Sequence, residues 1–119
     1  MTRFTADYAM AWFRAFLFTE AVEVPVYRFL AGAPTWAAFA ASAITHPFVW
    51  YFFPPVGDAL GLSYELTSVV SELFAWWVEA AFLVVAVKMP VRRALGFSFA
   101  ANAASVVVGL LSRKYLGYP

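Results

Sequence analysis

Apolar residues fill four long stretches of the chain, and short segments with charged residues, glycine or proline separate these stretches. A helix that crosses the hydrocarbon core of a bilayer needs about 20 mostly apolar residues. The pattern therefore predicts an all-α, polytopic membrane protein, in which one domain of 119 residues forms a bundle of four transmembrane helices. The expected spans cover about residues 9–30, 35–53, 68–88 and 91–112.

Proline positions divide this pattern into two halves. Pro34 and Pro90 each stand at the start of an expected span, where a missing N–H costs no hydrogen bond. A pair of prolines at residue 54 ends the second span and opens the only long connection, residues 54–67. The sequence thus predicts one helical hairpin over about 9–53 and a second over about 68–112.

The two hairpins resemble each other when the chain is aligned with itself so that Glu23 falls on Glu79, an alignment that we call the repeat register. Parallel repeats of this kind are related by an axis along the membrane normal. We therefore expect residues 16–52 and 72–108 to superpose as equivalent hairpins, with coincidence as the alternative explanation. The repeat register also places Pro34 on Pro90, Ser42 on Ser98 and His46 on Asn102.

Composition supports a membrane location. Hydrophobic residues make up 64% of the chain and charged residues 13%, whereas soluble domains average about half apolar and about a quarter charged. A chain this short cannot hide so much apolar surface in its own core, so the lipid bilayer is the expected partner. The net charge of +1 and the absence of a long basic run give no indication of nucleic-acid binding. The lack of cysteine excludes disulfides and thiolate metal sites.

Basic residues determine the expected orientation. Cytoplasmic loops of membrane proteins carry an excess of Lys and Arg. The two short loops carry Arg28 and the cluster at 88–93, while Arg113 and Lys114 lie toward the opposite side. Because the 88–93 cluster is the densest, we expect the short loops in the cytoplasm and both termini outside.

Several polar residues fall at mid-membrane depth when each span is measured from its short loop at a helical rise of about 1.5 Å per residue. A central charge that faced lipid would cost at least ~2.5–3.5 kcal/mol, so these side chains should converge inside the bundle. The central set consists of Glu20, Glu23, His46, Glu79 and Asn102. The supporting polar residues are Ser42, Thr45, Ser98, Ser105 and Glu72.

A proline next to His46 is expected to kink the second span beside these polar residues. Pro47 lies inside the second span and cannot donate a backbone hydrogen bond, which leaves the Ala43 carbonyl without its helical partner. Pro25 has the same effect on Ala21 in the first span. We therefore expect His46 to supply an imidazole beside a buried polar cluster, within reach of Glu20 or Glu23.

Two interpretations of these mid-membrane polar residues remain open. In the functional one, carboxyl groups with an imidazole and an amide oxygen bind a cation. Either the cation is a proton passed along a relay, or it is a divalent metal such as zinc, manganese or iron(II), held by Glu23, His46 and Glu79. In the structural one, neutral glutamic acids hydrogen-bond across helices. Two Glu-x-x-His motifs, which mark di-iron bundles, are absent from the sequence.

Some of these residues have a structural alternative of their own. Ser98, Asn102, Ser105 and Gly109 follow a spacing of small and polar residues that is typical of a tight helix–helix seam. Glu72 falls in the first turn of the third expected span, where the helix dipole favours a carboxylate, and is expected near the membrane surface.

The leading functional hypothesis is a small membrane protein that binds or conducts a cation, more consistent with a transport role than with an enzyme. Such a small bundle has little room for a pathway of its own, so a homo-oligomer or partner membrane subunits are expected. One alternative is a non-catalytic accessory subunit of a larger membrane complex. Another is a membrane enzyme that acts on a lipid, with Glu and His as its acid–base pair.

In length, number of spans and a membrane glutamate in the first span, the chain resembles the small multidrug resistance exporters. This resemblance implies a glutamate that exchanges protons for a cationic drug, and Glu20 or Glu23 would correspond to it. The chain departs from that family in its carboxylates in the third span and in its parallel repeat. The resemblance covers the outline of the chain and no specific motif.

Overall fold

The computed structural model describes residues 5–117, and this part of the chain is helical and contains no strand. The all-α prediction is confirmed, with four long helical segments that follow one another along the chain. The first hairpin consists of α1 (Ala6–Pro25), η1 (Val26–Leu30), α2 (Thr35–Pro47) and η2 (Phe48–Phe52); then come α3 (Phe53–Ala59), α4 (Tyr64–Val87) and α5 (Val91–Leu116). The segments η1 and η2 are π-helical and each directly follows a proline.

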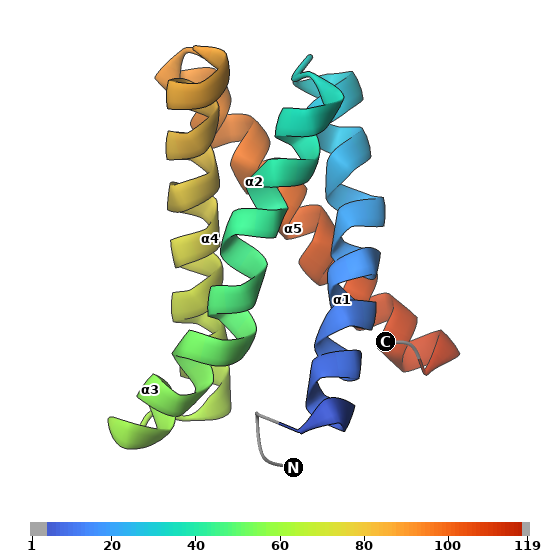
Figure 1. The fold of residues 1–119 in the computed structure, drawn as a ribbon, viewed down its shortest axis with the longest axis vertical. Helices are drawn as coiled ribbons and strands as arrows, with labels where there is room; N and C mark the ends of the chain where they lie inside the picture. The colour runs from blue at the N-terminus through green and yellow to red at the C-terminus, as the bar shows by residue number, and fades with distance from the viewer. Residues whose placement is uncertain (1–4, 118–119) are drawn as a thin grey trace.

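The long helices form a closed arrangement in which each hairpin contacts the other (Figure 1). Within the hairpins α1 packs on α2 and α4 packs on α5, and between them α2 packs on α4 and α1 on α5. Both hairpin turns lie at the top of Figure 1, which we call the turn end, whereas α3, the start of α1 and the end of α5 lie in its lower half, the terminal end.

The connection between the hairpins differs from the expected loop over 54–67. Its first part is the helix α3, because Pro54 and Pro55 occupy the first helical positions, where no N–H is required. Its last part belongs to α4, which begins at Tyr64, before the expected start at residue 68. Ser63 caps this helix by accepting a hydrogen bond of 3.1 Å from the backbone N–H of Leu66.

The two hairpin turns share the same backbone hydrogen bonds. At the first turn the N–H of Ala33 donates to the carbonyl of Tyr27 at 2.9 Å. At the second turn the N–H of Met89 donates to the carbonyl of Leu83 at 3.2 Å. Each bond reaches six residues back, one residue more than the long bond of a Schellman helix ending, and the repeat register relates one bond to the other.

The interior of the bundle is more polar than its exterior. The largest fully buried side chains are Tyr27, Leu83, Glu23, Glu79, Ser42 and Ser98. Large apolar side chains lie on the outside; Phe29, Val85 and Leu116, for example, are 77%, 80% and 79% exposed. Globular domains normally bury such residues. The apolar packing that remains inside comes mostly from alanines.

Two helices of the described residues, α4 and α5, are long and apolar enough to cross a membrane by length and composition. The other two long segments differ from them in sequence. Helix α1 carries Asp7, Arg14, Glu20 and Glu23, and α2 has only 13 residues before the π-helical turn that follows Pro47.

The hairpin turns generate a paired test of stability. Gly32 and Lys88, which the repeat register relates, both adopt a left-handed conformation, with φ of 76° and 56°. A residue with a Cβ pays about 1–2 kcal/mol in this region. Lys88→Gly should therefore raise the midpoint of thermal unfolding, measured by circular dichroism, and Gly32→Lys should lower it. Shifts of the same sign in both variants would show that the two turns are not equivalent.

Candidate functional site

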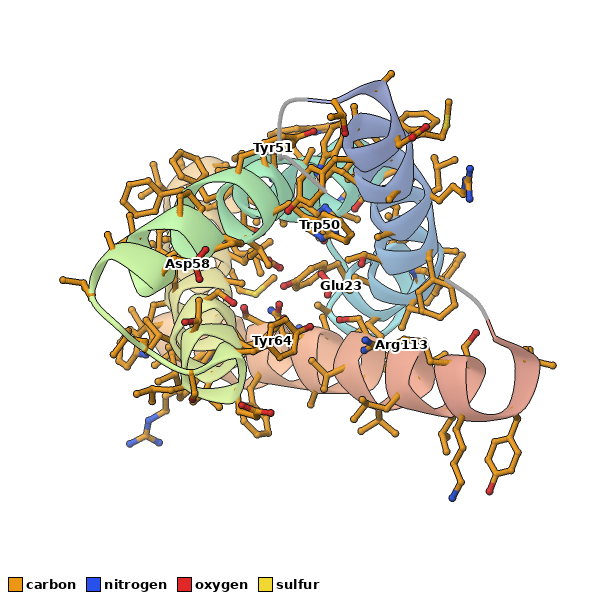
Figure 2. All side chains as sticks on the ribbon, turned by 90° about the horizontal axis from the view of Figure 1, so that it is seen from below. Glu23, Trp50, Tyr51, Asp58, Tyr64 and Arg113 are labelled. Carbon is orange, nitrogen blue, oxygen red and sulfur yellow. The ribbon has the colours of Figure 1, made fainter. Side chains whose placement is uncertain are left out.

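Two buried glutamates from different hairpins meet inside the bundle. Glu23 of α1 and Glu79 of α4 are each only 1% exposed, and their carboxyl groups are neighbours. Figure 2, which looks from the terminal end, shows Glu23 pointing into the interior that the helices surround. The structure thus brings together the two carboxyl groups that the repeat register relates.

Glu23 holds three helices together through its two carboxyl oxygens. The Ser42 hydroxyl of α2 donates to Oε1 at 2.5 Å. The Ser105 hydroxyl of α5 donates to Oε2 at 2.6 Å. The side chain therefore ties α1 both to its own hairpin partner and to the other hairpin.

Glu79 is held by three donors from three other segments. The Tyr27 hydroxyl of η1 donates to Oε1 at 2.6 Å, and the Asn102 amide of α5 donates to the same oxygen at 3.3 Å. The Thr45 hydroxyl of α2 donates to Oε2 at 2.6 Å. Like Glu23, Glu79 therefore bonds both to its own hairpin and to the other one.

The charge balance of this pair is the main chemical feature of the site. All five donors are neutral hydroxyl or amide groups. Within residues 5–117 no Lys or Arg side chain interacts with either carboxyl. Two buried negative charges without a positive partner would carry a large desolvation cost and repel each other. The two carboxyl groups therefore cannot both carry a bare charge in this interior without a large cost in free energy.

His46 lies apart from the carboxyl pair. Its Nε2 is 3.3 Å from the Thr19 hydroxyl oxygen, and its Nδ1 is buried without a hydrogen-bond partner. The expectation that His46 reaches Glu20 or Glu23 is not met by a direct bond. Adjacent helical residues point about 100° apart, so Thr45 faces Glu79 and His46 faces α1. On α1, however, the His46 ring contacts Phe16 and Thr19 and makes no hydrogen bond to the carboxyl group of Glu20 or Glu23.

The proposed metal-ligand set is also not assembled. In the described part of the chain, no group of three or more His, Cys, Asp or Glu side chains is placed to hold a metal ion. Glu23 and Glu79 adjoin each other, but the ring of His46 packs instead against Trp12 and Phe16, with centroid distances of 6.3 and 5.6 Å.

The remaining acidic residues occupy different surroundings. Glu20 is 6% exposed, and its carboxyl group lies beside the Ser42 hydroxyl and Glu23. Because Ser42 donates its single hydroxyl hydrogen to Glu23, neither carboxyl oxygen of Glu20 receives a hydrogen bond. Glu72 does not lie in a first helical turn as expected, because the Ser63 cap starts α4 two turns earlier. It lies in the middle of α4, away from both helix ends, and its side chain is partly buried.

The small residues of α5 form a seam, as their spacing indicates. Ser98 donates to the backbone carbonyl of Trp76 at 2.8 Å, which fastens α5 to α4. A Cβ at Gly109 would lie 3.8 Å from the ring of Phe18, so the Phe18 side chain of α1 packs on α5 there. Asn102 belongs both to this seam and to the carboxyl site, since besides its bond to Glu79 it also donates to the Ser98 carbonyl at 2.9 Å.

Tyr27 is the site residue that the sequence reasoning missed. It is fully buried, and besides Glu79 its hydroxyl also lies 3.3 Å from the Ser98 hydroxyl. The signal was its position one helical turn after Glu23, which places both side chains on one helix face. An aromatic residue in an apolar chain did not stand out as a hydrogen-bond donor.

A pair of isosteric variants measures how much the network of hydrogen bonds around Glu23 and Glu79 contributes to stability. Thr45→Val removes the donor to Oε2 of Glu79, and a buried acceptor left without its partner should cost about 1–3 kcal/mol of unfolding free energy. The matched control is Thr35→Val at the exposed start of α2, which should stay within ~0.5 kcal/mol. Equal effects of the two substitutions, measured by denaturant unfolding, would argue against the network.

Comparisons of the chain with protein-family models, with curated proteins and with solved structures give no match. The function is therefore argued from the geometry of the site itself.

Proposed function

We propose that the chain is a multi-pass integral membrane protein whose four long helical segments all cross the bilayer. The distribution of side chains supports this placement, because apolar residues face outward and the acidic residues Glu23 and Glu79 face inward. Lipid is the solvent in which such an arrangement is favourable, since buried polar groups are satisfied internally and apolar ones contact hydrocarbon. In this placement the short hairpin turns face the cytoplasm and both termini lie outside.

Within this membrane domain the two hairpins are parallel repeats. The equivalent backbone hydrogen bonds and the left-handed residues of both turns support the repeat. So do the buried positions of Glu23 and Glu79, and of Ser42 and Ser98. The repeat explains why each half supplies one central carboxyl group to the site.

The function of the site is to bind a cation, and the proton is the species that the contacts favour. One observation carries this proposal: two neighbouring, buried carboxyl groups receive hydrogen bonds only from neutral donors. A proton neutralises one carboxyl without displacing any of these donors. A divalent metal would require the hydroxyl groups of Ser42, Thr45 or Tyr27 to turn their oxygens toward the ion.

Infrared spectroscopy of the purified protein tests the proposal. The carbonyl band of a protonated carboxyl group should be present near pH 7, and Glu23→Gln or Glu79→Gln should remove or shift it. The control is Glu65→Gln at an exposed position in the first turn of α4, which should leave the band unchanged. A band that neither central substitution changes would contradict the proton site.

Metal analysis of the same sample separates the two cations. A divalent metal at a near-stoichiometric level in the wild-type protein, lost in Glu23→Gln, would replace the proton by a metal ion. The mass of the purified particle distinguishes a homo-oligomer from an accessory subunit, because an accessory subunit retains other chains in mild detergent.

A further inference from the structure

Three buried polar groups on the contact between α1 and α2 have no hydrogen-bond partner. They are both carboxyl oxygens of Glu20, Nδ1 of His46 and the indole Nε1 of Trp12. The Glu20 and His46 side chains are 6% and 8% exposed, so bulk solvent does not supply the missing bonds. Buried polar atoms in proteins almost always have a protein or water partner, and each exception requires an explanation.

These groups follow one line along the hairpin. Trp12, Phe16 and Glu20 succeed one another on α1 at intervals of one helical turn, so they share a face of the helix. The His46 ring packs against Trp12 and Phe16 from the side of α2. The inner end of the line is Glu20, which approaches Glu23. The line therefore leads from the central carboxyl pair toward the terminal end.

The mixture of donors and acceptors identifies the ligand class. The Trp12 indole can only donate, an ionised Glu20 can only accept, and His46 Nδ1 does either according to its tautomer. A bound cation would leave the indole donor unmatched, and a bound anion would be repelled by Glu20. Water both donates and accepts, and internal water typically bonds to two to four such groups.

The outer end of the line lies beside Trp50 and Tyr51, which Figure 2 shows next to the start of α1. The Trp50 carbonyl lacks helical donors because residues 54 and 55 are prolines. The Tyr8 hydroxyl donates to this carbonyl at 2.6 Å instead. This bond joins α1 to η2 and places a hydroxyl group at the outer end of the line.

The opposite side of the carboxyl pair is closed by apolar packing. Between the pair and the turn end lie Ala31, Ala33, Leu83, Met89 and Ala94, all at most 7% exposed and packed into one cluster. No comparable row of unpartnered polar atoms occurs there within the described residues. Protons therefore reach the pair of Glu23 and Glu79 more easily from the terminal end than from the turn end.

We infer that the contact between α1 and α2 holds a file of water molecules, bonded by Trp12, His46 and Glu20, through which protons pass between the terminal end and Glu23. This route rests on the proposed function, in which the central pair holds the proton. Each water accepts a proton from one side and releases one to the other, so no bond other than O–H or N–H changes and no further reactant is needed.

Deuterium exchange kinetics test the route. The protein is mixed with heavy water, and the isotope shift of the carboxyl band assigned to Glu23 and Glu79 is followed in time. His46→Phe and Glu20→Met remove the polar partners of the water, so the shift should slow on the order of a hundredfold, the effect of a lost proton-transfer group. Wild-type rates in both variants would overturn the route.

A control on the other hairpin and a conservative variant complete the test. Ser71→Ala removes a 3% exposed hydroxyl of α4 that bonds to the Ser68 carbonyl, and it should exchange like the wild type. Slow exchange in Ser71→Ala alone would place the route in the second hairpin and overturn the proposal. Glu20→Gln keeps the shape of the side chain but cannot relay a proton, so it should also slow exchange, even where Glu20→Met fails to fold.

The equilibrium spectrum separates failure of the route from failure of the proton site. If the band of a protonated carboxyl group is present but its hydrogen exchanges for deuterium at the same rate in all variants, only the route is rejected. A wild-type protein without any exchanging carboxyl band rejects the proton site and the route together.

Discussion

The structure depends on one constraint, namely that two carboxyl groups are buried side by side with only neutral hydrogen-bond donors around them. Glu23 and Glu79 are each 1% exposed, and the hydrogen bonds of these two residues connect all four long helical segments to one another. Two bare charges buried without a positive partner would carry a large cost in free energy. In the function proposed above, a proton on the pair removes this cost, and the contacts that hold the bundle together also form the proposed binding site.

The polar interior also explains the unusual use of residue types. Alanine and serine let the helices approach closely, as in helix pairs packed in lipid, where no hydrophobic driving force brings helices together. Ser42, Ser98 and Ser105 each donate a hydrogen bond to another helix while occupying little space. Prolines also shape the interior. Each π-helical segment directly follows a proline, and the wider turn changes the direction in which later side chains point.

The sequence was sufficient to predict the four long helical segments, though not α3 or the early start of α4, and to select Glu23 and Glu79 as partners from their similar depth along the helices. It could not predict which polar side chains face each other, because rotation about a helix axis depends on packing. Thr45 and His46 illustrate the difference: they are adjacent in the chain, but one bonds to Glu79 and the other to Thr19. Tyr27 was overlooked because its polar atom is one hydroxyl on a large apolar ring.

The most direct test of the central claim is the number of protons released when the protein unfolds. A group that is protonated in the native state and ionised in the unfolded state releases its proton on unfolding. Calorimetry in buffers of different ionisation enthalpy should detect about one more proton released at pH 7 by the wild type than by the Glu23→Gln, Glu79→Gln double variant. Equal proton release by the two proteins would contradict the claim that the buried pair holds a proton.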